Sequence, residues 1–222
     1  MEYFDGLTMN CVMFEKFELK AKQKIWRKIA EQLRLLQSIP PPNPSYYGRI
    51  NYQPWMPYAM LVGCVGDDMI GPFDTYEEFL QQIWVYFELR GMQRLALRST
   101  QGGCKIEEDP EMQIMAASFE RFFDKSSMAA EPKLTHMDLK LENMLLVPSH
   151  SDPSTELEDW DVVIIDWQDF GWMPAWAQPT GMWFRLNADG TDSDLALWNV
   201  LGFWYPETRL WLDYAKVFGG ML

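Results

Sequence analysis

The amino-acid sequence predicts an α+β fold in which helices dominate. Apolar residues recur at helical spacing in several long segments, which indicates amphipathic helices with one face toward a core. Short apolar runs lie between residues 134 and 165, and these are typical of strands in hairpins. A chain of 222 residues, 48% of them hydrophobic, is long enough for one domain with a substantial core.

The first predicted helix covers residues 17–38. Its apolar side chains repeat at helical spacing, with charged residues on the opposite face, and Pro40-Pro41-Pro42 is expected to stop it. Residues 39–74 then contain seven prolines and four glycines, which predicts a long connection with one short hairpin. Connections of this length inside a domain are unusual, and they are often functional.

Two further helices are predicted before the strands. The second begins at Thr75, where Thr75-Tyr76-Glu77-Glu78 spells a capping box, and is expected to end near Gly91. The third begins at Asp109-Pro110, a cap followed by a proline in the first turn. It carries an apolar stripe typical of core packing, formed by Met112, Met115, Phe119 and Phe122.

Short strands and two C-terminal helices complete the predicted order. The strands are expected at residues 134–136, 144–147 and 162–165, with a polar linker at 148–159 between the last two. The helices are expected at residues 192–204 and 206–218, where the second opens with a proline.

Composition and charge exclude several classes of function. The formal net charge is −13, so we expect neither nucleic-acid binding nor attraction to anionic membranes. No apolar run is long enough for a membrane-spanning helix, and no signal-peptide pattern opens the sequence. The three cysteines, Cys11, Cys64 and Cys104, are far apart and odd in number, which is typical of reduced thiols in a cytoplasmic protein.

Most of the negative charge lies in one segment. Residues 107–169 hold 16 acidic and 4 basic side chains. Two interpretations stay open: a solvated acidic face, or a site that gathers carboxylates to hold a divalent metal.

Three polar residues in this segment have the spacing and chemistry of a phosphoryl-transfer site. Asp138 is followed five positions later by Asn143, and Asp166 ends the apolar run at 162–165. Phosphoryl transfer needs one carboxylate to orient or deprotonate the attacking hydroxyl. It also needs an amide oxygen and a second carboxylate to hold magnesium against the phosphates.

These residues resemble the motifs of the aminoglycoside phosphotransferase and choline kinase-like family, which has a protein-kinase-like fold. His136-x-Asp138 with Asn143 is similar to that family's catalytic loop, and Ile165-Asp166-Trp167 with Gly171 is similar to its metal-binding turn. The resemblance covers most of the chain, with further matches at the helix of residues 17–38, at Gly71-Pro72-Phe73 and at the helix that begins at Thr75.

The resemblance implies a small-molecule phosphotransferase that uses ATP and Mg²⁺. Asp138 would be the catalytic base, His136 would hold the catalytic loop, and Asn143 and Asp166 would ligate magnesium. Lys140 would meet the transferred phosphate, as in protein kinases, and a solvent-facing role for this lysine stays equally open.

Asp169 competes with Asp166 for the metal. Asp169-Phe170-Gly171 spells the metal-binding triplet of protein kinases. We choose Asp166 because it directly ends an apolar strand, and because no Ala-Pro-Glu triplet follows to indicate a protein-kinase activation segment.

Two departures from the family bear on activity. The family's small lobe covers the nucleotide phosphates, and no matching segment precedes the first helix, so residues 1–222 are expected to form the large lobe alone. Residues 1–10 resemble the interlobe hinge, which implies adenine contacts for Tyr3 and Phe4. Met137 stands where the family usually has glycine, and it could crowd the phosphate path or pack differently.

Tryptophans are concentrated near the C-terminus, where the last 63 residues hold eight of the eleven. They predict either a Trp-rich core or an aromatic pocket for a hydrophobic metabolite. Trp172 and Trp176 follow the expected metal turn, where the resemblance implies substrate-facing segments. Together with Met137 they form the candidate substrate pocket.

Three functions compete on these observations. The first is transfer of a phosphoryl group from ATP-Mg to a hydroxyl of a small metabolite. The alternative is an ATP-independent enzyme of specialised metabolism, with acid–base chemistry such as cyclisation or isomerisation, or a ligand-binding protein. The third is an inactive, truncated pseudokinase. Apolar surface near the hinge also predicts a homodimer.

Overall fold

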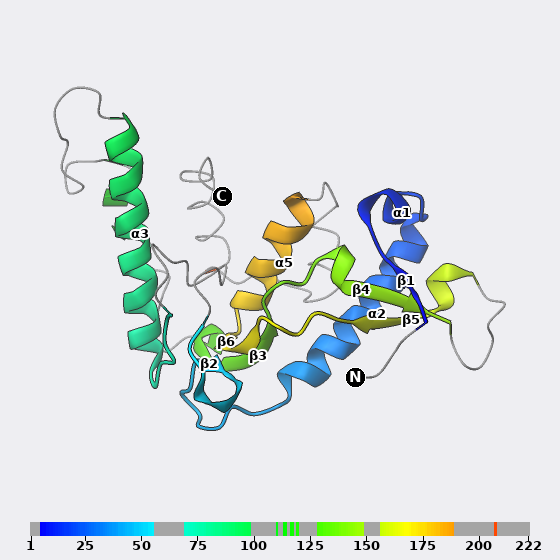
Figure 1. The fold of residues 1–222 in the computed structure, drawn as a ribbon, viewed down its shortest axis with the longest axis horizontal. Coiled ribbons are helices and arrows are strands. Elements are labelled where there is room, and N and C mark those ends of the chain that lie inside the picture. Colours follow the sequence, from blue (N-terminus) through cyan, green and yellow to red (C-terminus); the bar gives the residue numbers. More distant parts are fainter. Residues whose placement is uncertain are drawn as a thin grey trace.

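The computed structural model describes residues 5–55, 69–98, 128–148 and 156–188, together with residues 110, 113, 114, 116, 117, 119 and 207. Over these residues the fold is α+β, with helices around two small antiparallel sheets (Figure 1). Helix α3 stands at one end of the molecule and α1 lies near the other, while α2 and α5 lie between them beside the strands.

The N-terminal part is built on one long amphipathic helix. Strand β1 (Leu7–Thr8) and helix α1 (Cys11–Glu15) lead into α2 (Leu19–Gln37). One face of α2 is buried, through Ala21, Ile25, Trp26, Ile29, Ala30 and Leu33. This confirms the predicted helix, which Ser38 closes as its C-cap just before the run of prolines.

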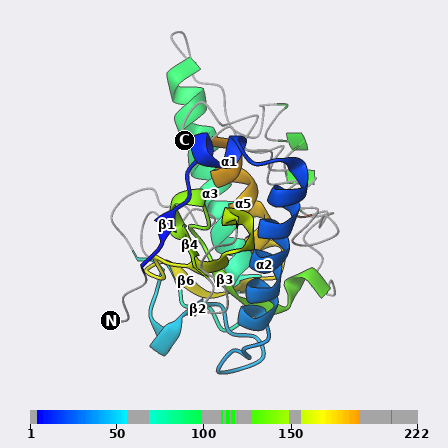
Figure 2. The ribbon, with the colours of Figure 1, turned by 90° about the vertical axis from the view of Figure 1, so that its right-hand side faces the viewer.

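The first sheet has the strand order β1-β4-β5 and packs against α2. Strand β4 (Met144–Val147) pairs with β5 (Asp161–Ile164), with Met144 opposite Ile164. Both strands were predictable from their apolar runs. Figure 2 shows α2 running along one side of the strands. Their inward side chains join the buried face of α2 in a single core, with Met144, Leu146, Val162 and Ile164 as the strand contribution.

The second sheet has the order β2-β6-β3, and β3 leads into the candidate catalytic loop. Strands β2 (Gly48–Arg49) and β3 (Pro132–His136) both pair with the central strand β6 (Phe170–Pro174). Gly171 of β6 allows β2 to approach, because a Cβ there would lie 2.5 Å from the Gly48 carbonyl oxygen. Within the connection at 39–74, Gly48 and Arg49 are therefore held by pairing with β6. Residues 56–68 of the connection lie outside the described part.

Helix α3 (Tyr76–Arg98) begins after Thr75, which caps it as predicted, while the return bond of the capping box goes to Asp74 instead of Thr75. The Glu78 amide donates to Thr75 Oγ1 over 3.1 Å, and the Glu78 carboxylate accepts from the Asp74 amide over 3.0 Å. The predicted end near Gly91 is wrong, since the helix continues to Arg98. A glycine costs about 1 kcal/mol inside a helix, and the strong helix formers around Gly91 offset that cost.

The prediction that helices dominate is not borne out by the described residues. Strand β6, for which the sequence pattern predicts no element, is the centre of a sheet. The predicted C-terminal helices lie outside the described part except for Glu207, which is helical and buried. Of the third predicted helix, only scattered residues are described, and Met112, Met115 and Phe122 are not among them.

Helix α5 (Ala177–Ala188) is a further departure from the sequence prediction, which places no helix there. Pro179 and Gly181 have poor helix propensity. Pro179 is tolerated because it lies in the first turn, where backbone N–H groups have no intrahelical partner. None of the helices in the described part is long and apolar enough to span a membrane.

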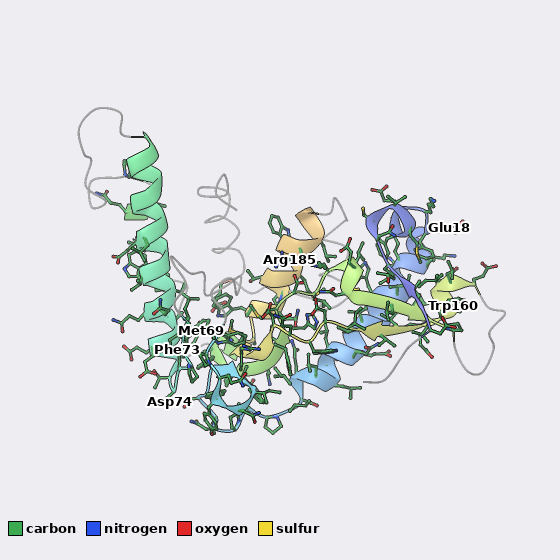
Figure 3. The ribbon with its side chains drawn as sticks, viewed as in Figure 1. Glu18, Met69, Phe73, Asp74, Trp160 and Arg185 are labelled. Atoms are coloured by element: carbon green, nitrogen blue, oxygen red, sulfur yellow. The ribbon has the colours of Figure 1, made fainter. Side chains whose placement is uncertain are left out.

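Lys28 joins α2 to the turn that precedes β5. Its Nζ donates to the carbonyl oxygens of Glu158, at 3.2 Å, Asp159, at 2.9 Å, and Trp160. Trp160 lies at this junction in Figure 3. Burial lowers the pKa of the Lys28 ammonium, and the charge of Asp161 raises it.

We expect Lys28→Met to lower the free energy of unfolding by about 1–3 kcal/mol, because three part-buried carbonyls lose a charged donor. Urea unfolding at neutral pH measures the change. Lys20→Met, at an exposed position on the same helix, is the matched control. Equal stabilities for the two variants would contradict the assigned role of Lys28.

Candidate active site

Asp138 lies in the turn after β3, where both of its carboxylate oxygens face cations. Lys140 Nζ lies 3.0 Å from Oδ2, and Arg185 Nε lies 2.7 Å from Oδ1. The Arg185 contact is an ion pair without hydrogen-bond alignment, since neither Nε nor Oδ1 has a hydrogen-bond partner in the described part of the chain. The Asp138 side chain is 17% exposed, so most of it is buried and a small part of it contacts solvent.

Asn143 connects this loop to the end of β5. It is buried in the 3₁₀ turn Leu141–Asn143, just before β4. Its Nδ2 donates to the Asp138 backbone oxygen over 2.7 Å and to Asp138 Oδ2 over 3.0 Å. Because the Nδ2 end of the amide faces Asp138, the Oδ1 end remains the acceptor. The Asn143 backbone oxygen accepts from the Ile165 amide over 2.9 Å. This bond holds Ile165, the residue that precedes Asp166.

Asp166 follows β5 in the left-handed backbone region, with φ of 62°, and is exposed. A non-glycine residue in this region is uncommon, and such strain clusters at functional sites. Its neighbours hold the turn in place. Ile165 is bonded to Asn143, and the Trp167 indole donates to the Ile164 carbonyl oxygen over 2.9 Å.

His136 is a buried link between β3 and the Asp166 turn. Its Nε2 lies 3.0 Å from the Ile165 carbonyl oxygen, and because that oxygen can only accept, Nε2 carries the proton. Burial lowers the pKa of the imidazole. Its ring also packs edge-on against Trp167, with centroids 4.8 Å apart. His136 therefore links the end of β3 to the turn that carries Asp166.

Asp169 lies close to the other two aspartates. Burial raises the pKa of its carboxyl, Arg49 lowers it, and the charges of Asp138 and Asp166 raise it. Its backbone oxygen accepts from the Met137 amide over 2.9 Å, and Arg49 Nη2 donates to the Gln168 carbonyl oxygen over 3.1 Å. Asp138 and Asp166 thus both act electrostatically on Asp169, the second candidate metal ligand.

The candidate metal ligands differ from a metal site built by protein side chains alone. Within the described ranges, no group of three or more His, Cys, Asp or Glu side chains could hold a metal ion. Magnesium in phosphoryl-transfer sites binds through one or two carboxylates, and phosphates and water complete its shell. The exposed Asp166 carboxylate and the Asn143 amide oxygen have the hard-oxygen chemistry that such a site uses.

The other predicted site residues are buried or lie outside the described residues. Tyr3 and Phe4, the candidate adenine contacts, are outside the described residues. Met137 is buried, and so are the two candidate pocket tryptophans. Trp172 packs against Tyr46 with ring centroids 6.0 Å apart, and Trp176 packs against Phe79 at 6.2 Å.

Sequence reasoning missed three residues that shape the site. Arg185 and Gln178 come from α5, and Arg49 comes from β2. The Gln178 amide accepts from the His136 backbone N–H over 2.9 Å and donates to its carbonyl oxygen over 3.1 Å, which anchors the end of β3. An isolated arginine or glutamine carries no sequence signal of its own. Recognition of the proline in the first turn of α5 could have indicated the helix that carries Arg185 and Gln178.

Comparisons with known proteins identify no family for this chain. Models of known protein families give no match, and no curated protein matches the sequence. Among solved structures, the fold is similar to that of an ethanolamine kinase from Plasmodium vivax, with a TM-score of 0.41 and 14% sequence identity. The alignment covers 98% of this chain and 54% of the kinase chain, so this chain spans about half the length of that protein.

Proposed function

We propose that this chain carries the catalytic centre of a small-molecule phosphotransferase, which transfers a phosphoryl group from ATP-Mg to a hydroxyl of a metabolite. The observation that supports the proposal most is the bonded path from Asp138 through Asn143 to Ile165 and Asp166. This path links a candidate base to two candidate magnesium ligands. Phosphoryl transfer needs both kinds of residue close to the same reaction centre.

Each residue has a distinct role in this proposal. Asp138 would orient the acceptor hydroxyl and accept its proton as the new oxygen–phosphorus bond forms. Asn143, through its amide oxygen, and Asp166 would hold magnesium, which when bound offsets negative charge on the phosphate oxygens. Lys140, with a side chain 32% exposed and next to Asp138, would face the transferred phosphate. His136 and Gln178 would keep the loop in place without touching the substrate.

Isothermal titration of the chain with ATP and MgCl₂ tests the proposal, followed by phosphate-transfer assays on a panel of alcohols. We expect magnesium-dependent nucleotide binding that Asp166→Asn weakens. Absence of nucleotide binding at about millimolar concentration would reject the proposal. Conversion of a metabolite in EDTA and without ATP would instead support the acid–base alternative.

A further inference from the structure

The position of Arg185 raises the question of how Asp138 could act as a base. A carboxylate oxygen that takes a proton from an alcohol must first accept the alcohol O–H. Both Asp138 oxygens already face a cation, however, with Arg185 on Oδ1 and Lys140 on Oδ2. Asp138 Oδ1 is also buried, so a neighbouring group has to move before an acceptor hydroxyl can reach it.

Arg185 is the better candidate to move. Lys140 lies on the same loop as Asp138, and Asn143 also donates to Oδ2, so that oxygen is held by local contacts. Arg185 comes from α5, reaches Oδ1 without hydrogen-bond alignment, and leaves the Nε–H unsatisfied in the described part of the chain. Its side chain is 39% exposed although Nε is buried, so other atoms of the side chain face solvent. Figure 3 shows Arg185 on the helix beside the site strands.

The charges around Asp138 indicate which ligand could draw Arg185 away. Two cations contact one carboxylate there, and Asp169 has Arg49 close by. An ammonium group has donors and no acceptor, so it cannot pair with the guanidinium and offers Arg185 no alternative partner. A carboxylate or phosphate on the ligand would instead pair with the guanidinium fork, which binds planar anions through two donors.

We propose that Arg185 is a specificity-determining residue that recognises an anionic group on the acceptor, so that the substrate class is a hydroxyl compound bearing a carboxylate or phosphate. The anionic group takes the guanidinium, and the substrate hydroxyl takes the vacated place at Asp138 Oδ1. This rests on the proposed phosphotransferase function, and it makes amino alcohols poor acceptors.

Three probes that differ in one group test the proposal: glycerate, glycerol and 3-aminopropane-1,2-diol. Their dissociation constants are measured by titration into the full chain without nucleotide, and acceptor activity is measured with ATP-Mg. We expect glycerate to bind about tenfold to a hundredfold more tightly than the other two, the range for a charge-assisted contact. Arg185→Gln should remove that preference, and Arg185→Lys should retain part of it.

The control is Arg27→Gln, an exposed arginine on α2 away from the site. It should keep the wild-type preference. Equal binding of the three probes, a preference for the amine, or failure to bind glycerate at about 10 mM would overturn the proposal. Phosphate transfer to the amine would overturn it while leaving the phosphotransferase function standing. Glycerate binding without any nucleotide binding would reject that function instead, so the two failures are distinguishable.

Discussion

Asp138→Asn should lower the rate of phosphoryl transfer by about 10²- to 10⁴-fold, the contribution expected of a positioned general base. The amide can still occupy the site and contact a hydroxyl, but it cannot accept the proton. Nucleotide binding should change little, because the proposed magnesium ligands are Asn143 and Asp166. Single-turnover transfer assays with the best acceptor, alongside titration with ATP-Mg, separate these two effects.

Glu142→Gln is the matched control for this prediction. Glu142 is exposed on the same loop, and its loss changes the net charge of the chain by the same amount. Its transfer rate should stay within about threefold of wild type, since a surface charge contributes little. Unfolding of both variants in urea accounts for the loss of ion pairs to Lys140 and Arg185. A rate for Asp138→Asn that matches the control would show that Asp138 is not the base.

The parts of the fold that could be predicted depend on the spacing of residues within a single segment of the sequence. The buried face of α2, the cap at Thr75 and strands β4 and β5 follow from spacing within one segment. The proximity of Asp138 and Asn143 follows as well, because only four residues lie between them. The position of Asp166 at the end of β5 follows in part from the predicted hairpin, because β4 and β5 pair as antiparallel neighbours.

The parts that could not be predicted depend on contacts between distant segments. Arg185 reaches Asp138 from a helix that contains Gly181, so burial against the strands outweighs the low helix propensity of glycine there. Arg49 reaches the acidic turn from the Pro/Gly-rich connection, because Gly171 lets β2 lie close to β6. These cations approach the aspartates only in the folded chain. The acidic composition of residues 107–169 therefore could not predict the contacts.

The role of the tryptophans also could not be predicted from the sequence, because their number does not distinguish an aromatic pocket from a core. Trp176 has no exposed surface, and its indole donates to the Tyr76 hydroxyl over 3.0 Å. It lies among aromatic rings from α3 and from the connection that precedes that helix, including Phe79 and Tyr47. This position indicates a residue that joins α3 to the second sheet, so its removal should affect stability before it affects any ligand.

Trp176→Ala is accordingly expected to lower the free energy of unfolding by about 3–5 kcal/mol, the cost of emptying a large buried site. Trp176→Phe should cost less, about 1–2 kcal/mol, because the ring contact with Phe79 survives while the indole donor to Tyr76 is lost. Leu35→Ala removes a side chain that is 71% exposed, and it should change stability by less than about 0.5 kcal/mol. Urea unfolding followed by circular dichroism measures all three variants. Unchanged stability of Trp176→Ala, combined with weaker binding of an acceptor, would assign Trp176 to the substrate pocket rather than to the core.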